Sequence, residues 1–185
     1  MALTNGDDIV EVYIKRPLPP DAGSPVVDHL DDRRRSETVA WSGSLTSVQP
    51  RIRLTRSFDE RSHTYLGYLL LVEGIVGGSS TTFRVGIGSE TQAKHQFRIG
   101  DQVEGMGHRV VDPRLETADI YKVSKLKLIR RGEAPATTAP WNGVPPTLPV
   151  YRERGHRRLA VATYDAKCTS CIWGCAMPVE IIIDP

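Results

Sequence analysis

The chain has 185 residues, a formal net charge of +2, and 39% hydrophobic but only 6% aromatic residues. This length and composition suit one domain with extensions or two small domains, and they exclude a large core. The charge is uneven, because residues 1–50 hold five basic and eight acidic side chains, whereas residues 51–131 hold fourteen basic and nine acidic ones. The basic central segment permits nucleic-acid binding without requiring it.

The sequence has no feature typical of a secreted or membrane-spanning protein. Its N-terminus has no basic start followed by an apolar run, and its longest apolar stretch, Tyr65 to Val76, is twelve residues long and contains Glu73. Both features argue against export and membrane insertion. The three cysteines, an odd number clustered in sequence, do not suggest a disulfide framework. We therefore expect a cytoplasmic protein with no membrane partner.

Residues 1–50 are predicted to form a partly irregular leader. Prolines interrupt this segment, and its charges come in blocks that include three consecutive arginines. Such charge blocks are usually solvated loops. Within the leader only Asp8–Arg16 alternates apolar and polar residues as a strand does.

Residues 51–131 carry a strong β pattern. A long β-rich run, Tyr65–Val76, is followed by a GGSS turn and by a second run, Thr82–Ile87. Two further runs follow, over 97–111 and 119–131. The first contains glycines and a Gly-Asp turn that suggest bulges and sharp coiling. With no convincing amphipathic helix between them, these runs predict a mostly β protein built on a small antiparallel barrel.

The C-terminal third is predicted to be a strap followed by a cysteine-rich tail. Residues 132–150 contain five prolines, which favour an extended strap, and Trp141 is expected to pack it along the barrel. Residues 151–185 begin with a basic patch. Strands are expected over Val161–Ala166 and over the final run PVEIIID, on either side of a cysteine turn.

The cysteines provide the clearest chemical signal in the chain. Cys168, Cys171 and Cys175 have the spacing C-x2-C-x3-C. Thiolates two residues apart converge in a tight turn, and for this reason C-x2-C recurs in zinc and iron–sulfur sites. Because structural zinc takes four ligands, we expect zinc held by the three cysteines and His156. An iron–sulfur cluster is the alternative cofactor, and three free thiols packed around Trp173 are the metal-free alternative.

The fourth ligand has other candidates besides His156. His108 approaches if its predicted barrel strand lies near the cysteine turn, and a ligand following Pro185 would serve if the natural chain continues. Asp165 and Glu180 are weaker oxygen ligands for zinc. Catalysis by a cysteine nucleophile is less favoured than ligation, because three thiols so close together suit a metal better than nucleophilic attack.

Basic side chains from the second and third strands of the predicted barrel, and from the patch before the cysteines, are expected to contact a nucleic-acid backbone. Contacts of this kind give affinity without sequence preference. The alternative is that they only keep a β surface soluble. These candidates are Arg84, Lys94, Arg98, Arg109, Arg152, Arg154, Arg157 and Arg158.

The central segment resembles the OB-fold. The resemblance rests on the glycine-interrupted strand Tyr65–Val76, its partner Thr82–Ile87, and the FRIGDQVEG sequence over Phe97–Gly105, and it covers less than half of the chain. It implies a binding face on the second and third strands for oligonucleotides or oligosaccharides. The cysteine segment resembles half of a zinc ribbon or a cysteine-ligated cluster site.

Together these features predict a non-enzymatic, single-stranded nucleic-acid-binding protein with an OB-like barrel and a structural metal site. Two alternatives remain. One is an assembly module that binds a protein partner or a second copy through its barrel and its C-terminal edge strand. The other is an iron–sulfur redox or sensor protein.

Overall fold

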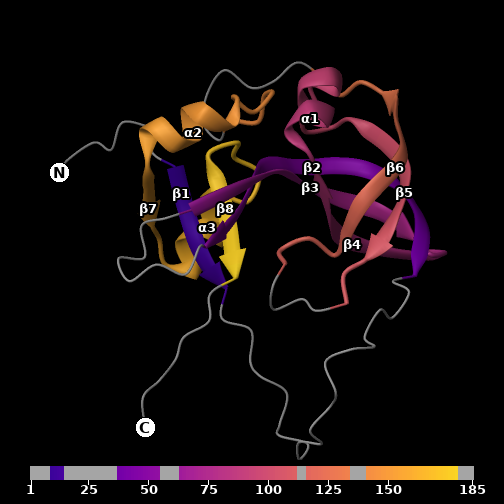
Figure 1. Cartoon of the computed structure of the whole chain (residues 1–185), viewed down its shortest axis with the longest axis horizontal. Helices are drawn as coiled ribbons and strands as arrows, with labels where there is room; N and C mark the ends of the chain where they lie inside the picture. Colours follow the sequence, from indigo (N-terminus) through magenta and orange to yellow (C-terminus); the bar gives the residue numbers. More distant parts are fainter. Residues whose placement is uncertain (1–8, 15–36, 55–62, 112–115, 134–140, 179–185) are drawn as a thin grey trace, which may run out of the picture.

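A computed structural model describes residues 9–14, 37–54, 63–111, 116–133 and 141–178. This part of the chain is mostly β and consists of a five-stranded ring beside a smaller sheet with helices (Figure 1). No helix in it is long and apolar enough to cross a membrane. The ring strands are β2 (Thr38–Leu54), β3 (His63–Val76), β4 (Ser79–Ile87), β5 (Gln102–Arg109) and β6 (Ile120–Arg130). The other elements are β1 (Ile9–Ile14), β7 (His156–Arg158), β8 (Gly174–Pro178), α1 (Ser89–His95), α2 (Leu148–Arg154) and α3 (Val161–Lys167).

The ring closes in the order β2-β3-β4-β6-β5, with β5 pairing back to β2. All neighbours are antiparallel except β4 and β6, which meet in parallel at Val85 and Ile120. The β3–β4 hairpin turns at Gly77 and Gly78, whose φ values of 57° and 87° suit a tight two-residue turn. The β5–β6 pairing is irregular at three points. The mostly β prediction is therefore confirmed.

Alternation along the strands places apolar side chains inside the ring. Phe83, Val85 and Ile87 of β4 are buried, and the intervening Arg84 lies half-buried on the outward face. The Phe83 ring packs edge-on against Trp41 of β2, with centroids 6.1 Å apart. Such aromatic pairs stabilise a core beyond the area they bury.

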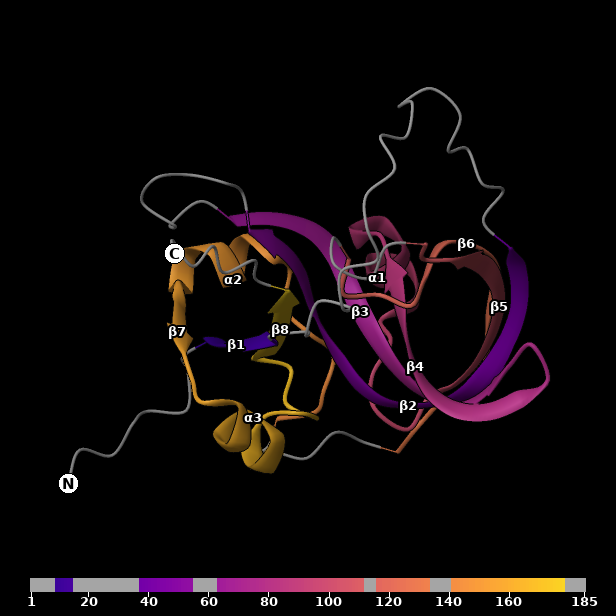
Figure 2. The ribbon, with the colours of Figure 1, turned by 90° about the horizontal axis from the view of Figure 1, so that it is seen from below.

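The smaller sheet joins the two ends of the chain. β1 lies in its centre and pairs in parallel with β7 on one side and β8 on the other. Figure 2 shows this sheet between α2 and α3, next to the ring. The strand expected over Asp8–Arg16 is thus present as β1. The expected leader and tail are not separate extensions, because the structure pairs them with each other.

The first ring strand begins earlier than residue 51, the expected start of the barrel. β2 starts at Thr38 and places Val39, Trp41 and Leu45 in the core. A register shift between Leu45 and Ser47 then changes which residues face inward. Serines and glycines alternate with the apolar residues here, and the shift breaks the period of two, so the pattern did not identify this strand.

The segment 51–131, expected to contain no helix, contains α1, and the strand expected over Val161–Ala166 is instead the helix α3. Each of the three helices has seven residues, too few for a 3.6-residue period to be visible. α2 has a proline in its first turn, and α3 buries only Tyr164. These helices therefore depend on contacts with the rest of the protein rather than on an apolar stripe.

The described part of the strap is hydrogen-bonded to the rest of the protein. The Trp141 carbonyl accepts a hydrogen bond from the backbone N–H of Ile172 at 2.8 Å. The Tyr68 hydroxyl of β3 donates to the Pro146 carbonyl at 2.7 Å. The strap thus contacts both the ring and the cysteine segment. Residues 134–140 and the expected strand from Val179 onward lie outside the described residues.

Candidate functional site at the junction of the ring and the cysteine turn

One buried side chain of the ring holds the cysteine turn in place. Gln49 of β2 is 4% exposed, and its Nε2 donates to the carbonyl oxygens of Cys168, Thr169 and Cys171 at 2.9, 3.2 and 3.0 Å. Its Oε1 accepts a hydrogen bond from the Tyr164 hydroxyl at 2.7 Å. An unsatisfied buried polar group costs about 1–3 kcal/mol, so this amide is a strong link between the two parts of the fold.

Gly174 allows the turn to approach the ring this closely. A Cβ at this position would lie 2.3 Å from the Cys168 carbonyl oxygen and 2.4 Å from Gln49 Nε2. Both distances are far below van der Waals contact, so any side chain would push β8 away from β2. The cysteine turn is therefore packed onto the ring by glycine and glutamine together.

The three thiols are buried but have different surroundings. Cys168, at the end of α3, packs with Tyr164 and Ala176. Burial raises the pKa of the Cys168 thiol, and the nearby Cys171 raises it further. Cys175 instead donates its thiol to the Pro50 carbonyl at 3.5 Å and packs with neighbours from β2 and β8. Cys168 and Cys171 thus form a close pair, and Cys175 faces β2.

The described residues contain no group of three or more His, Cys, Asp or Glu side chains arranged to hold a metal ion. The side chain of His156 lies outside the described part, as do Glu180 and the C-terminal residues. The backbone of His156 lies on β7, two strands from β8 across the sheet. Two strand spacings correspond to roughly 10 Å. His108, on β5 of the ring, contacts the Thr38 hydroxyl through Nδ1 at 3.5 Å.

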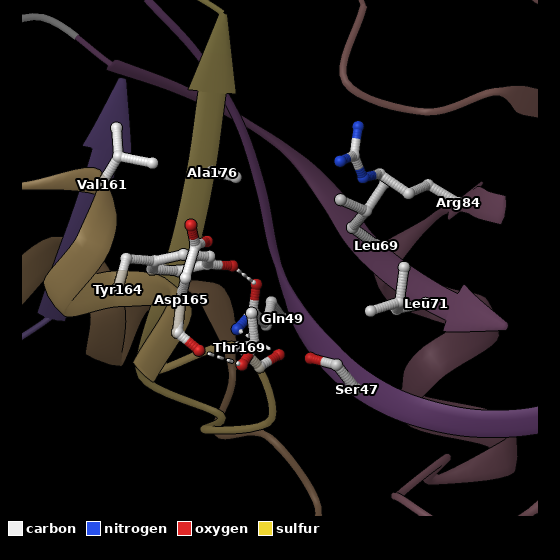
Figure 3. Close-up of a pocket in the computed structure, with 10 residues that line it drawn as sticks. All are labelled: Ser47, Gln49, Leu69, Leu71, Arg84, Val161, Tyr164, Asp165, Thr169 and Ala176. Atoms are coloured by element: carbon white, nitrogen blue, oxygen red, sulfur yellow. Dashed lines mark hydrogen bonds between the residues drawn. The ribbon is translucent and has the colours of Figure 1, made fainter. Parts of the chain in front are cut away.

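A cavity of about 280 Å³ lies between the ring and α3, next to the cysteine turn (Figure 3). One wall comes from the outward face of β2, β3 and β4, and the other comes from α3, the cysteine turn and β8. The ring wall consists of Ser47, Gln49, Leu69, Leu71 and Arg84, and the opposite wall consists of Val161, Tyr164, Asp165, Thr169 and Ala176.

Some polar groups of this pocket already have partners. The Gln49 amide and the Tyr164 hydroxyl bind each other, and the Thr169 hydroxyl donates to the Asp165 carbonyl at 3.2 Å. Burial raises the pKa of Tyr164 well above 10, although the hydrogen bond to Gln49 and the charge of Arg84 oppose this rise. Tyr164 is therefore a neutral hydrogen-bond donor and not a general base.

Three other polar groups of the pocket have no partner within the described residues. The Ser47 hydroxyl is one, and its side chain is only 2% exposed. The guanidinium of Arg84 and the carboxylate of Asp165 also lack a hydrogen bond or an ion pair in this part of the chain. In Figure 3 the Arg84 side chain extends from β4 toward the gap between the two walls. A buried hydroxyl, a cation and an anion therefore line one small cavity.

The other basic residues predicted on the ring lie elsewhere and have different contacts. Lys94 is exposed in the last turn of α1. Arg98 is half-buried and donates from Nη2 to the Gly132 carbonyl at 3.0 Å. Arg109, at the end of β5, pairs with Glu37 at 3.5 Å. The structure thus does not gather these residues around Arg84.

Two predicted arginines of α2 lie over aromatic rings. The Arg152 guanidinium is 5.2 Å from the centre of the Tyr65 ring, and the Arg154 guanidinium is 4.1 Å from that of Trp173. We call these four residues the α2 surface. Both arginines are exposed and both rings are half-buried. The side chains of Arg157 and Arg158 on β7 lie outside the described residues.

Sequence reasoning did not identify Ser47 and Gln49 as site residues. Both fall in residues 1–50, which looked irregular, and an isolated serine or glutamine carries no motif. Their role depends on residues more than a hundred positions away, such as Cys168. Comparison with known proteins adds no family: no family model, no curated protein and no solved structure matches the chain.

Proposed function

We propose that this protein binds single-stranded nucleic acid, as a binding protein rather than an enzyme. The ring has the five strands of an OB-fold, whose ligands lie across the second and third strands. In this ring those strands are β3 and β4. Their outward face carries Arg84, whose guanidinium has no partner within the described residues and lines a cavity. This cation, unpaired in the part of the chain that the structure describes, lies on the expected binding face and is the observation that carries the proposal.

The α2 surface supports the same function. Nucleic-acid bases stack on aromatic rings and on the planar faces of arginine side chains. Arg152 and Arg154 present exposed guanidinium groups held over Tyr65 and Trp173. This arrangement combines positive charge with stacking platforms, which a strand without base pairing requires.

The first prediction concerns salt and charge. A single-stranded oligonucleotide of about 15 nucleotides is expected to bind, with a logarithmic affinity that falls linearly with the logarithm of salt concentration, by roughly 0.7 per phosphate contact. Replacing Arg152 and Arg154 together with glutamine is expected to lower both the affinity and this slope. Fluorescence anisotropy between about 50 and 200 mM salt measures both.

A double variant that removes two charges elsewhere, Lys125→Gln with Lys127→Gln on β6, controls for the loss of net charge. Arg98→Ala is a poorer test, because Arg98 also binds the Gly132 carbonyl. An affinity that does not change with salt, or no binding at all, would contradict the proposal.

We further propose a structural metal at the cysteine turn, with zinc as the expected ion and an iron–sulfur cluster as the alternative. The close pair Cys168 and Cys171 supports it, since C-x2-C turns present two thiolates to one ion. Cys175 and His156 remain the proposed further ligands. Thiol ligands stay reduced in the cytoplasm, which is the compartment that we propose.

The second prediction is that the purified protein is colourless and contains one zinc ion per chain by elemental analysis. Cys171→Ser is expected to abolish zinc binding, and a chelator is expected to lower the Tm, because metal affinity contributes to folding. Cys175→Ser tests whether the third cysteine is a ligand. Brown protein would favour the iron–sulfur cluster, and metal-free protein with a chelator-insensitive Tm would exclude both.

Assembly is the second candidate function. Within the described residues β8 is an edge strand that pairs only with β1, and an edge strand can pair with another chain. The final run PVEIIID, expected to serve this role, continues from β8 beyond the described residues. Light scattering after size exclusion distinguishes the two candidates, since a stable dimer without nucleic acid favours assembly.

A further inference from the structure

The pocket beside Arg84 has the size and chemistry of a site for a single nucleobase, an inference that rests on the proposed function. Its volume is about 280 Å³. Pockets for drug-sized molecules have roughly 300–1,000 Å³, so this one has room for one base and little more. Proteins that read single strands turn individual bases out of the strand and bind their edges in this way.

The unpartnered groups of the pocket define which base edges it can bind. The Arg84 guanidinium only donates hydrogen bonds, and an ionised Asp165 carboxylate only accepts them. They come from opposite walls, β4 of the ring and α3. The buried Ser47 hydroxyl, without a partner in the described part of the chain, can do either. A matching ligand has two acceptors on one edge and a donor on another.

Guanine is the base that offers this combination. Its O6 and N7 form a pair of acceptors that a guanidinium binds with two hydrogen bonds, and its N2 amino group donates. Adenine has a donor beside N7, thymine has no amino group, and cytosine lacks the N7–O6 pair. Leu69, Leu71 and Val161 supply apolar wall on both sides of the cavity. We propose that this pocket binds guanine, with Arg84 at O6 and N7 and Asp165 at the N2 amino group.

The test compares thymidine oligonucleotides that carry one central guanine, adenine or cytosine, or none, with the full chain. We expect the guanine strand to bind roughly tenfold to a hundredfold more tightly than the others. Arg84→Lys is expected to remove this preference while leaving the salt slope unchanged, because lysine keeps the charge but lacks the planar fork. Ser47→Ala is expected to lower the affinity for the guanine strand without lowering the Tm.

A titration with GMP distinguishes a guanine that belongs to a nucleic-acid strand from one that belongs to a free nucleotide. Arg84-dependent binding of GMP without oligonucleotide binding would assign the pocket to a free nucleotide, supporting the guanine site while removing the proposed function. Salt-dependent binding of all strands with equal affinity would overturn the guanine site and leave the proposed function standing. Equal binding of cytosine and guanine, or a preference that survives Arg84→Lys, would also overturn it.

Discussion

At the scale of single residues, a half-buried ion pair fixes the loop before β6 to the outward face of the ring. Arg51 of β2 donates from Nε to a Glu116 carboxylate oxygen at 2.9 Å and forms a second bond through Nη2. The Arg51 guanidinium lies over Gly86, where a Cβ would be 2.9 Å from Nη1. Burial alone would raise the pKa of Glu116, but hydrogen bonds from Arg51 and from the Ala118 backbone outweigh it, and the pKa is lowered from 4.5.

The third prediction follows from this lowered pKa. Above pH 4.5 the Glu116 carboxyl is ionised in both the folded and the unfolded chain, and its contribution to stability is then fully present. This contribution disappears as the pH falls through the lower pKa that Glu116 has in the folded state. Glu116→Gln is expected to lower the free energy of unfolding by about 1–3 kcal/mol near neutral pH, and by less near pH 3. Chemical denaturation of both proteins at the two pH values measures the difference.

Glu104→Gln is the matched control for the ion pair. Glu104 pairs with Lys127 at 2.9 Å, but both side chains are exposed. Exposed pairs contribute about 0–1 kcal/mol, so this variant should change little at either pH. A Glu116→Gln effect that is equally large in acid would contradict the role of its charge.

At the scale of elements, β2 and β3 approach each other unusually closely where two glycines pair. Gly43 of β2 faces Gly74 of β3. A Cβ at Gly74 would lie 2.1 Å from the Ser42 carbonyl oxygen and 2.5 Å from the Gly43 Cα. The contact is backbone against backbone, so no side-chain movement can relieve it. The curvature that closes the ring thus depends on glycine at this crossing.

The fourth prediction is that Gly74→Ala lowers the free energy of unfolding by more than about 2 kcal/mol, through overpacking against β2. Gly88→Ala is the control, because a Cβ there meets no atom within 4 Å and the φ of −77° is ordinary. It should change stability by less than about 1 kcal/mol. Denaturant titration of both variants decides the matter, and equal effects would show that the crossing is not the cause.

At the scale of the whole molecule, the two ends of the chain form one sheet. β1 pairs with β7 through Ile9–Glu11 and with β8 through Val10–Ile14. β8 in turn packs against β2, and Gln49 binds the turn before it. The N-terminal strand therefore supports the segment that forms one wall of the pocket.

The fifth prediction is that Val12→Pro loosens the smaller sheet and spares the ring. Proline in a central strand removes a backbone donor and fits poorly between two partners. Hydrogen exchange is expected to accelerate over 156–178 and to stay slow over 68–87. Unchanged exchange over 156–178 would mean that β1 does not support the smaller sheet.

Much of the fold was visible in the sequence for simple physical reasons. The runs that became β3 and β4 are long, rich in apolar, aromatic and β-branched residues, and separated by two glycines, so their pattern and turn are local properties. The early start of β2 was missed because a bulge and small polar residues obscure its alternation. The short helices were missed because their only strong signal is burial against other elements.

The sequence by itself determined a mostly β protein with the strands β3 and β4 joined by a two-glycine turn, because period and turn composition act over a few neighbouring positions. Only the tertiary structure decided that β1 lies between β7 and β8, that Gln49 binds the cysteine turn, and that Ser47, Arg84 and Asp165 line one cavity. These residues meet because the ring closes and the C-terminal segment packs onto its outward face. Contacts across more than a hundred residues leave no periodic trace in the chain.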